Sequence, residues 1–384
     1  GDVNLAPQLP PGRVDEPAWV WGDAISFLRG ADVLAVNHEA TLAGVGDTDP
    51  ATIQFEDPLN YLDTYGDERG VGVDFMAIAN NHQFDYHDVG TVTTLTTLRK
   101  MNLAHGGVGL TAADVRAPVV VVRGGRHIAF FTMVFDECYR YASNNTLYLD
   151  GCTCGDNAGA PPPYQCRPAN GTALGLWYHW RITDAFINEA SAVVEAHKRA
   201  HREHVVVAFL HVGPNFQWHP YRQHEYLLRN LSYAGADVVW GTSSHHVQRF
   251  EWFDAPRNAQ TNMPAMTKPI IYGLGDLLFR HVVGVDDFCP LYAIPCQAYN
   301  PALALTYRFT IAFDNATTAT PRVLPQVRAL GTRHTEHQTF AVSQSADVSW
   351  LIGTFDALAV GAKLVYTGTN GIFDVVPTTQ HSTP

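Results

Sequence analysis

Two stretches, VVVAFLHVGPN at residues 205–215 and GADVVWGTSSHHVQ at residues 235–248, decide the fold that this sequence predicts. The first opens with a continuous apolar run rich in β-branched residues, which is typical of a buried strand, and the run ends at His211. The second contains a shorter apolar run that leads directly into a polar loop with His245. Residues 222–234, between the two runs, have the apolar spacing of a helix. A strand–helix–strand unit of this length favours parallel strands, so both histidines are expected at one sheet edge, where open α/β sheets bind ligands.

Other strand-like runs also lead into polar side chains. They are residues 32–36, followed by Asn37, His38 and Glu39; residues 73–79, followed by Asn80, Asn81 and His82; and residues 269–275, followed by Asp276. Any one such loop is more often a plain polar loop than a binding site. Several of them on one sheet edge, together with Asp2 near the start of the sequence, predict a site.

These side chains carry the chemistry of a metal centre. Carboxylate, amide and imidazole groups together suit borderline divalent ions such as zinc, manganese or iron, so we expect one or two such ions. Two ions a few ångströms apart lower the pKa of a shared water and hold the oxygens of a phosphate or carbonyl, and a nearby histidine protonates the leaving group. Asn215 and Asp276 are weaker candidates, since an aspartate after glycine is often a turn residue. We assign both to substrate binding.

Composition limits the classes of partner. With 384 residues, of which 46% are hydrophobic, the chain can bury a large core. Its net charge of −12 and its scattered basic residues disfavour a nucleic acid partner. The longest apolar runs are shorter than the ~18 residues of a membrane helix, so we expect no transmembrane segment. The opening at Gly1 and Asp2, with no strand before them, suggests a cropped or processed N-terminus.

Cysteines and sequons indicate the compartment. An even number of cysteines in loops rich in glycine and proline predicts disulfides and an oxidising environment. A zinc site is the alternative, although Cys-x-Cys without a second close pair is poor zinc spacing. Four glycosylation sequons agree with secretion, so we expect a secreted or extracellular surface protein. The cysteines are Cys138, Cys152, Cys154, Cys166, Cys289 and Cys296, and the sequons begin at Asn144, Asn170, Asn230 and Asn315.

The pattern along the chain is mixed α/β, with parallel units in the first half and strand pairs later. We expect a single domain over residues 1–376, a disulfide-stapled cysteine-rich insertion at residues 136–177, and a disordered tail at residues 377–384. Expected helices span residues 23–29, capped by Asp23, and residues 90–101, 182–201 and 348–360. Further strands are expected at residues 119–122, 127–134, 302–313 and 321–330.

Six motifs make the resemblance to a known family specific. They are GDVNL from Gly1, WGDAISFLRGADVLAVNHEATL from Trp21, DFMAIANNHQFDY from Asp74, HVGPN from His211, GADVVWGTSSHHVQ from Gly235 and IYGLGD from Ile271. In these stretches the sequence resembles the bacterial capsule-synthesis proteins associated with poly-γ-glutamate, a branch of the calcineurin-like metallophosphoesterase superfamily. The resemblance covers nearly the whole chain except the cysteine-rich insertion.

The resemblance implies a two-layered metallophosphoesterase-like β-sandwich flanked by helices, with the metal centre at the strand ends. Its ligands would be the acidic Asp2 and Glu39, the latter bridging, with Asn81, His211 and His245. The resemblance assigns His82 as the catalytic, transition-state histidine.

The sequence departs from the family pattern at three positions. Thr242 stands where the family usually has a histidine, which puts the second metal position in doubt because threonine is a poor ligand. Glu56 replaces a usual arginine, which weakens the expectation of an anionic substrate. His38 replaces a usual leucine, and whether it compensates for Thr242 stays open at this point.

Three functions are consistent with these observations. The first is a secreted metal-dependent hydrolase that acts on a phosphoester or on a γ-glutamyl or related amide bond of a small-molecule or polymer substrate. The second is a non-catalytic family member that serves as a structural or binding module of an extracellular assembly, through self-assembly or a cell-surface partner. The third is a sugar or peptide binder that uses aromatic residues expected at the surface, Trp177, Tyr178, Trp180 and Trp218.

Overall fold

The computed structural model confirms the mixed α/β class. It describes residues 2–4, 13, 16–42, 56–57, 63–66, 70–83, 86–135, 147–148, 167–168, 174–179, 182–215, 217–278, 300, 302–313, 320–335 and 338–378. All six cysteines, three of the four sequons and the expected tail beyond residue 378 lie outside these residues. In the described part of the chain, no helix has both the length and the apolar character needed to cross a membrane.

A parallel sheet holds the beginning of the chain. Its order is β18-β1-β2-β5-β6, so β1 lies between β2, the next strand along the chain, and β18, which comes from much later in the sequence. The bounds are β1 Asp2–Val3, β2 Ala35–His38, β5 Phe75–Ala77, β6 Ala104–Gly106 and β18 Asp276–Leu278.

A second sheet contains the two stretches that the sequence singled out. Both are strands as expected, they run parallel, and the helix expected between them is present. The order is β13-β9-β14-β15-β17-β16, with β8 paired antiparallel to β9 and β16 antiparallel to β17. The bounds are β8 Val119–Arg123, β9 Arg126–Phe135, β13 Tyr178–His179, β14 Val205–His211, β15 Val238–Thr242, β16 Phe250–Ala255 and β17 Met266–Ile271.

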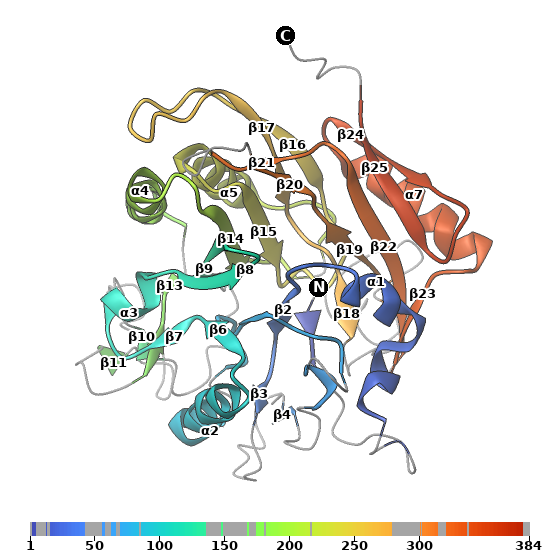
Figure 1. The fold of residues 1–384 in the computed structure, drawn as a ribbon, viewed down its shortest axis with the longest axis horizontal. Coiled ribbons are helices and arrows are strands. Elements are labelled where there is room, and N and C mark those ends of the chain that lie inside the picture. The colour runs from blue at the N-terminus through green and yellow to red at the C-terminus, as the bar shows by residue number, and fades with distance from the viewer. Residues whose placement is uncertain are drawn as a thin grey trace.

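Helices cover the outer face of each of these sheets. The bounds are η1 Pro17–Ala24, α1 Ile25–Arg29, α2 His87–Lys100, α3 Ala112–Arg116, α4 Asp184–Ala200, α5 Arg222–Ala234 and α7 Ser345–Leu358. In Figure 1, α4 and α5 lie beside the sheet of β9, β14 and β15, while α2 lies below β6. One core cluster joins α4 and α5 to the second sheet, and another joins η1, α1 and α2 to the first.

The two sheets face each other through alternating side chains. On β5, Phe75 points into the shared core while Met76 points toward the helices, as the two-residue period of a strand requires. The ring of Phe75 stacks on that of Phe130 from β9, with 4.0 Å between centroids. The order of layers is therefore helix, sheet, sheet, helix.

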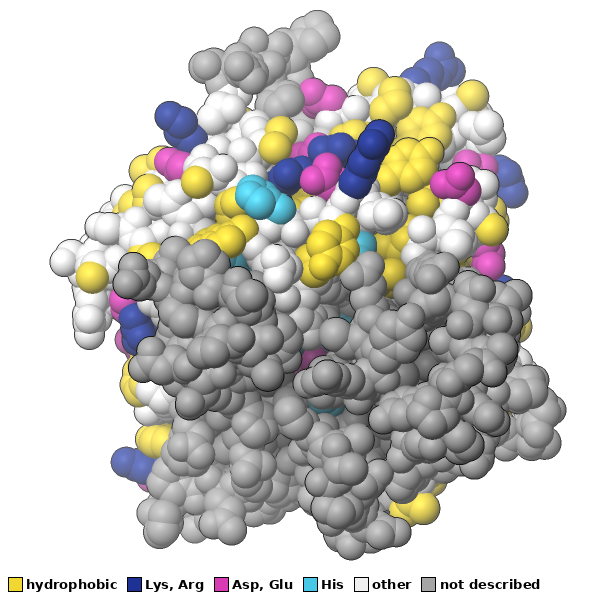
Figure 2. Space-filling view, turned by 180° about the vertical axis from the view of Figure 1, so that it is seen from behind, with side chains coloured by type: hydrophobic (Ala, Val, Ile, Leu, Met, Phe, Trp, Pro, Cys, Tyr) yellow, Lys and Arg dark blue, Asp and Glu magenta, His cyan; other side chains and the backbone are white. Residues whose placement is uncertain are grey.

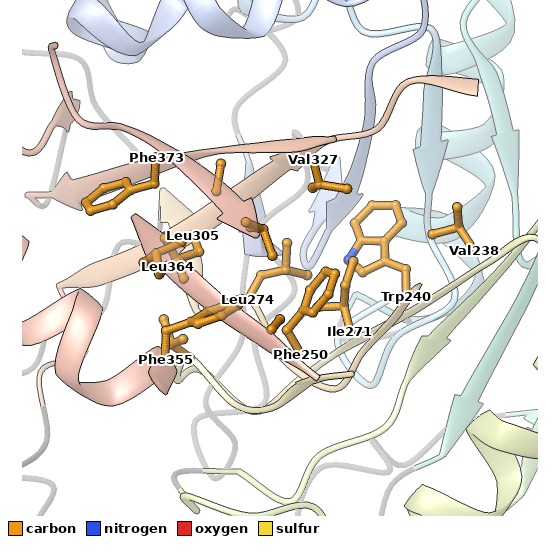
Figure 3. Packing of buried hydrophobic residues seen from close by; sticks show 14 of the residues in the cluster. Val238, Trp240, Phe250, Ile271, Leu274, Leu305, Val327, Phe355, Leu364 and Phe373 are labelled. Carbon is orange, nitrogen blue, oxygen red and sulfur yellow. The ribbon is translucent and has the colours of Figure 1, made fainter. Parts of the chain in front are cut away.

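A C-terminal antiparallel sheet extends this shared core. Its bounds are β19 Leu303–Arg308, β22 Val327–His334, β23 Thr339–Ala341, β24 Ala362–Tyr366 and β25 Ile372–Pro377. Figure 3 shows Phe250 and Ile271 of the second sheet packed against Leu305, Leu364 and Phe373 of this one. The remaining strands form small sheets: β3 Thr41–Leu42 with β4 Glu56–Asp57, β20 Ile311–Ala312 with β21 Arg322–Val323, and β7 Val108–Gly109, β10 Leu147–Tyr148, β11 Arg167–Pro168 and β12 Gly175–Leu176 together.

Surface charges on the described residues are mixed. On the face in Figure 2, Lys and Arg side chains stand singly or beside acidic ones. Ion pairs among the described residues join Arg229 to Glu225 and Glu251, and Arg249 to Glu225.

Three local expectations are wrong. Asp23 does not cap a helix, since it lies inside η1 and its Oδ1 accepts a hydrogen bond of 2.6 Å from the backbone of Ala341. Asp276 begins β18 rather than ending a strand. Trp177 is not a surface aromatic: it is fully buried against Phe186 of α4, because the helix that covers it is contributed by a later part of the chain.

Candidate metal centre

The candidate centre lies where the carboxyl-terminal ends of the two parallel sheets meet. In the first sheet, Asp2 is in register with Asn37 on one side and Asp276 on the other. In the second, His211 at the end of β14 is in register with Thr242 at the end of β15. Asn37 Nδ2 lies 3.3 Å from His211 Nδ1, so side chains of the two sheets are in contact here.

Glu39, directly after β2, lies at the middle of this group. Its side chain is fully buried, and neither carboxylate oxygen makes a hydrogen bond. Its Oε1 lies 3.5 Å from Nε2 of His211 and 3.7 Å from Nε2 of His245. Burial raises the pKa of Glu39 well above its ordinary value; His245 opposes this shift, and the nearby carboxylates reinforce it. A buried carboxylate without hydrogen bonds is costly to keep unless a cation or proton compensates it.

Asp2 is held in place by groups from both sheets. Asn37 Nδ2 donates to its Oδ1 over 2.7 Å, and the backbone N–H of Ser243 donates to its Oδ2 over 3.1 Å. Ser243 has a positive φ of 77°, a left-handed conformation that is uncommon for residues other than glycine. The loop after β15 is thus bent so that its backbone faces the first strand.

His211 is buried and has polar neighbours at both ring nitrogens. Its Nε2 lies 2.8 Å from Asn81 Oδ1, and its Nδ1 lies 3.1 Å from Thr242 Oγ1. Burial lowers the pKa of His211 to about 3, despite the opposing effect of Asp2. The ring is therefore neutral at physiological pH, which is the form that binds metals.

His245 is paired with a carboxylate. Its Nδ1 lies 2.9 Å from Asp276 Oδ1, and its φ of 49° is also left-handed. Burial alone would lower the pKa of His245, but the carboxylates of Asp276 and Glu39 raise it to about 10. A histidine whose second nitrogen is oriented by a carboxylate is a common arrangement at metal sites.

These residues fit a divalent cation. Two donor sets have ligand atoms within 4.8 Å of one another: Asp2, Glu39 and His211 form one, and Asp2, His245 and Asp276 form the other. The nitrogen and oxygen donors are of the type that zinc, manganese and iron accept. The two carboxylate oxygens of Glu39, which make no hydrogen bonds, are the atoms that would coordinate a cation.

The other predicted residues border this group. His82 is buried, and its backbone N–H donates to Asn80 Oδ1 over 3.1 Å; its charge would lower the pKa of His211, which places it nearby. Asn215 Oδ1 accepts a hydrogen bond of 2.9 Å from Ser243 Oγ. Asp276, expected on the substrate side, lies within a donor set.

Some features of the centre were absent from the sequence expectations. His38 does not take the place of the missing histidine at Thr242: it belongs to neither donor set, and its Nδ1 lies 3.0 Å from the hydroxyl of Tyr65. The supporting role of Asn37 had a sequence signal, because this amide lies two residues before Glu39 at the end of the same predicted strand. The backbone N–H of Ser243 had none.

Comparison with known proteins found a matching family model and distant relatives. The family model described as "Bacterial capsule synthesis protein PGA_cap" matches residues 1–281. Proteins of two Mycobacterium tuberculosis strains, each described as "Probable polyglutamine synthesis accessory protein", are 24% identical over 300 residues, which is 75% of this chain. The match spans 65% of the length of these relatives. The chain belongs to the bacterial capsule synthesis protein family PGA_cap.

Proposed function

We propose that this protein is a metal-dependent hydrolase of the metallophosphoesterase type that acts in the making or trimming of an extracellular polymer. The observation that carries the proposal is the carboxylate of Glu39, which is fully buried, makes no hydrogen bond, and lies 3.5 and 3.7 Å from two histidines. A bound divalent cation would offset the desolvation cost of this carboxylate.

The ligands in this proposal are Asp2, Glu39, Asn81, His211 and His245. A divalent ion bound there would supply a water of lowered pKa and a Lewis acid for a phosphoryl or carbonyl oxygen. The chain's own residues orient these donors: Asn37 and Ser243 fix Asp2, Thr242 contacts Nδ1 of His211, and Asp276 fixes His245.

His82 serves as the proton donor to the leaving group in this scheme. It follows Asn81, which contacts His211, so it borders the donor set. A histidine in such a position contributes typically about 10²- to 10⁴-fold to a rate.

The substrate class is a phosphoester or a γ-glutamyl or related amide bond. The relatives' description, polyglutamine synthesis accessory protein, supports the amide alternative, and the carboxylate and histidine donor set supports both. Asn215 lies on the rim of the centre through its bond to Ser243 and is the residue that we assign to substrate contact.

The test combines metal analysis with hydrolysis assays. Purified protein, loaded with Zn²⁺, Mn²⁺ or Fe²⁺, is assayed on bis-p-nitrophenyl phosphate and on γ-glutamyl-p-nitroanilide. We expect bound metal and turnover of one of these substrates, with turnover and the metal of this centre lost in Glu39→Gln. Glu195→Gln, a partly exposed glutamate that pairs with Arg199, is the matched control and should keep both. Protein that binds no metal and hydrolyses neither substrate would contradict the proposal.

A second function is favoured by one observation. His211 and His245 already have protein partners at 2.8 and 2.9 Å, and Thr242 supplies no strong ligand. If these contacts keep a metal ion out, the centre is not catalytic, and the protein serves instead as a binding module of an extracellular assembly. A folded protein that is inert toward both substrates and forms oligomers would favour this alternative.

We also propose that the protein is secreted, with its six cysteines in disulfides and its sequons glycosylated where the host permits. The support is the even cysteine count and the four sequons. Asn230 is the sequon residue within the described chain; it lies on α5, and its Nδ2 donates to the Tyr226 carbonyl over 2.7 Å. Mass spectrometry of non-reduced peptides from native protein tests the disulfides, and six free thiols would rule them out.

A further inference from the structure

A second group of histidines lies at the opposite end of β14 from the centre described above. His204 directly precedes this strand, whereas His211 ends it. A seven-residue strand separates its two ends by about 20 Å at ~3.3 Å per residue. The two groups are therefore distinct places in the molecule.

The members of this second group come from three elements. His197 is in the last turn of α4, His201 is its C-cap, and His127 is on β9. His197 and His201 are four residues apart, so they share one helix face, and their ring centroids are 4.9 Å apart. The His204 ring stacks on that of His201 at 4.6 Å and on that of His127 at 4.8 Å.

Donor atoms converge on one point of this group. Ligand atoms of His201, Glu203 and His204 all lie within 4.8 Å of one another. Oε1 of Glu203 lies 3.6 Å from His204 Nε2 and 4.0 Å from His201 Nδ1. Two imidazoles and a carboxylate form a donor set that zinc accepts. Zinc–ligand bonds of about 2.0–2.2 Å would require these donor atoms to move only slightly closer to one another.

His197 orients His204 for this role. Its Nε2 lies 3.2 Å from His204 Nδ1, so these two nitrogens share a hydrogen bond and His204 Nε2 is left to face Glu203. Metal-binding histidines characteristically use their second nitrogen in this way. Burial and the neighbouring histidines also lower the pKa of His204, which favours the neutral, metal-binding ring.

The surrounding charges permit a cation. Lys198 is the nearest buried cation, and it is compensated by Asp237, whose Oδ2 lies 2.8 Å from its Nζ. The group also lies at the C-terminal end of α4, a 17-residue helix, and the helix dipole favours positive charge there.

We propose that His201, Glu203 and His204 form a second metal site, for an imidazole-preferring divalent ion of the zinc class. The site is partly open to solvent, because the side chains of His201 and Glu203 are 48% and 39% exposed. Three protein ligands leave a position for water or another molecule. The bound ion joins the end of α4 to the start of β14 and so stabilises the fold.

The experiment uses the whole protein, stripped with a chelator and titrated with Zn²⁺ by calorimetry. We compare it with His201→Gln and Glu203→Gln, which change exposed side chains, and with His219→Gln, an exposed histidine outside both groups. We expect both site variants to bind one equivalent fewer than wild type, or to bind it at least tenfold more weakly. Zn²⁺ should raise the thermal unfolding midpoint less in these variants, and His219→Gln should match wild type.

A second measurement separates this site from the candidate catalytic centre. In the Glu39→Gln background, where the centre lacks a ligand, Zn²⁺ binding that is sensitive to His201→Gln should persist. Cu²⁺, used as a probe, should show nitrogen coupling in its electron paramagnetic resonance spectrum that His201→Gln weakens, because one of the two imidazole ligands is lost. Unchanged stoichiometry, affinity and Cu²⁺ spectrum in His201→Gln and Glu203→Gln would overturn the proposal and leave the hydrolase proposal untouched.

Discussion

Asp276 Oδ1 lies 2.9 Å from Nδ1 of His245, and both side chains are buried at the edge of the candidate centre. This pair links the beginning of β18 to the loop after β15, so it ties the first sheet to the second. It also orients the imidazole, whose Nε2 faces Glu39 at 3.7 Å.

Replacing Asp276 with Asn should therefore weaken metal binding without removing a predicted primary ligand. The amide keeps the size of the side chain but loses the charge that supports the imidazole. We expect about a 10- to 100-fold loss in metal affinity, which is typical of such supporting residues. Competition with a fluorescent chelator measures it, and Asp254→Asn, an exposed aspartate on β16, is the control. Equal affinities in both variants would argue against the supporting role.

Thr242→His tests the departure from the family pattern. Thr242 ends β15 in register with His211, and its Oγ1 lies 3.1 Å from that ring. A histidine there would add an imidazole to the donor set, so we expect tighter binding of a second ion, read as a higher metal stoichiometry by elemental analysis. A protein that is folded by circular dichroism and has unchanged stoichiometry would show that Thr242 does not limit the second position.

Lys198→Met should be strongly destabilising. Lys198 and Asp237 are both buried, their charged atoms are 2.8 Å apart, and Lys198 Nζ also donates to the His204 carbonyl over 2.7 Å. Removing one partner leaves an uncompensated buried charge, which costs about 3–5 kcal/mol. Urea unfolding measures the loss, and the double variant Lys198→Met/Asp237→Asn should recover part of it. A double variant no more stable than the single one would contradict this account.

Stability should fall as the pH drops below about 6.5, in part because of His224. This histidine is buried on α5 between the rings of Phe135 and Tyr221, and burial lowers its pKa to about 4. Between the unfolded pKa of ~6.5 and the folded pKa, the unfolded chain binds a proton that the folded one does not, so acid favours unfolding. The titration of His224 should make the free energy of unfolding about 2 kcal/mol lower at pH 5 than at pH 8.

The matched variant for this prediction is His224→Phe, which keeps an aromatic ring and removes the titration. Urea midpoints at pH 8 and pH 5 should differ less in this variant than in wild type. An identical pH dependence in the two proteins would contradict the prediction, because it would mean that the titration of His224 does not contribute to stability.

Much of the framework could be predicted from local sequence. The β-branched run before His211 became β14, because a strand buried on both faces leaves a continuous apolar run. Residues 222–234 became α5, because a helix buried on one face leaves apolar residues at helical spacing. The register was not predictable in this way. Nothing near Asp2 indicates that it pairs with Asp276, since the pairing depends on the whole intervening chain.

Support from the backbone was also beyond sequence analysis. Ser243 contributes its N–H rather than its hydroxyl to Asp2, and any residue able to adopt its backbone conformation could do the same. Trp177 was expected at the surface as one of a group of exposed aromatic residues. Its burial depends on Phe186 and the rest of α4, which a local pattern does not reveal.

The pairing of β1 with both β2 and β18 has a consequence for biosynthesis. The strand that holds Asp2 can find one partner early, but its other partner is not made until the ribosome has passed residue 278. Contacts of such long sequence separation form slowly and late. A chain that ends before Asp276 therefore cannot complete the centre, and the hydrolytic activity that we propose would arise only once β18 has left the ribosome.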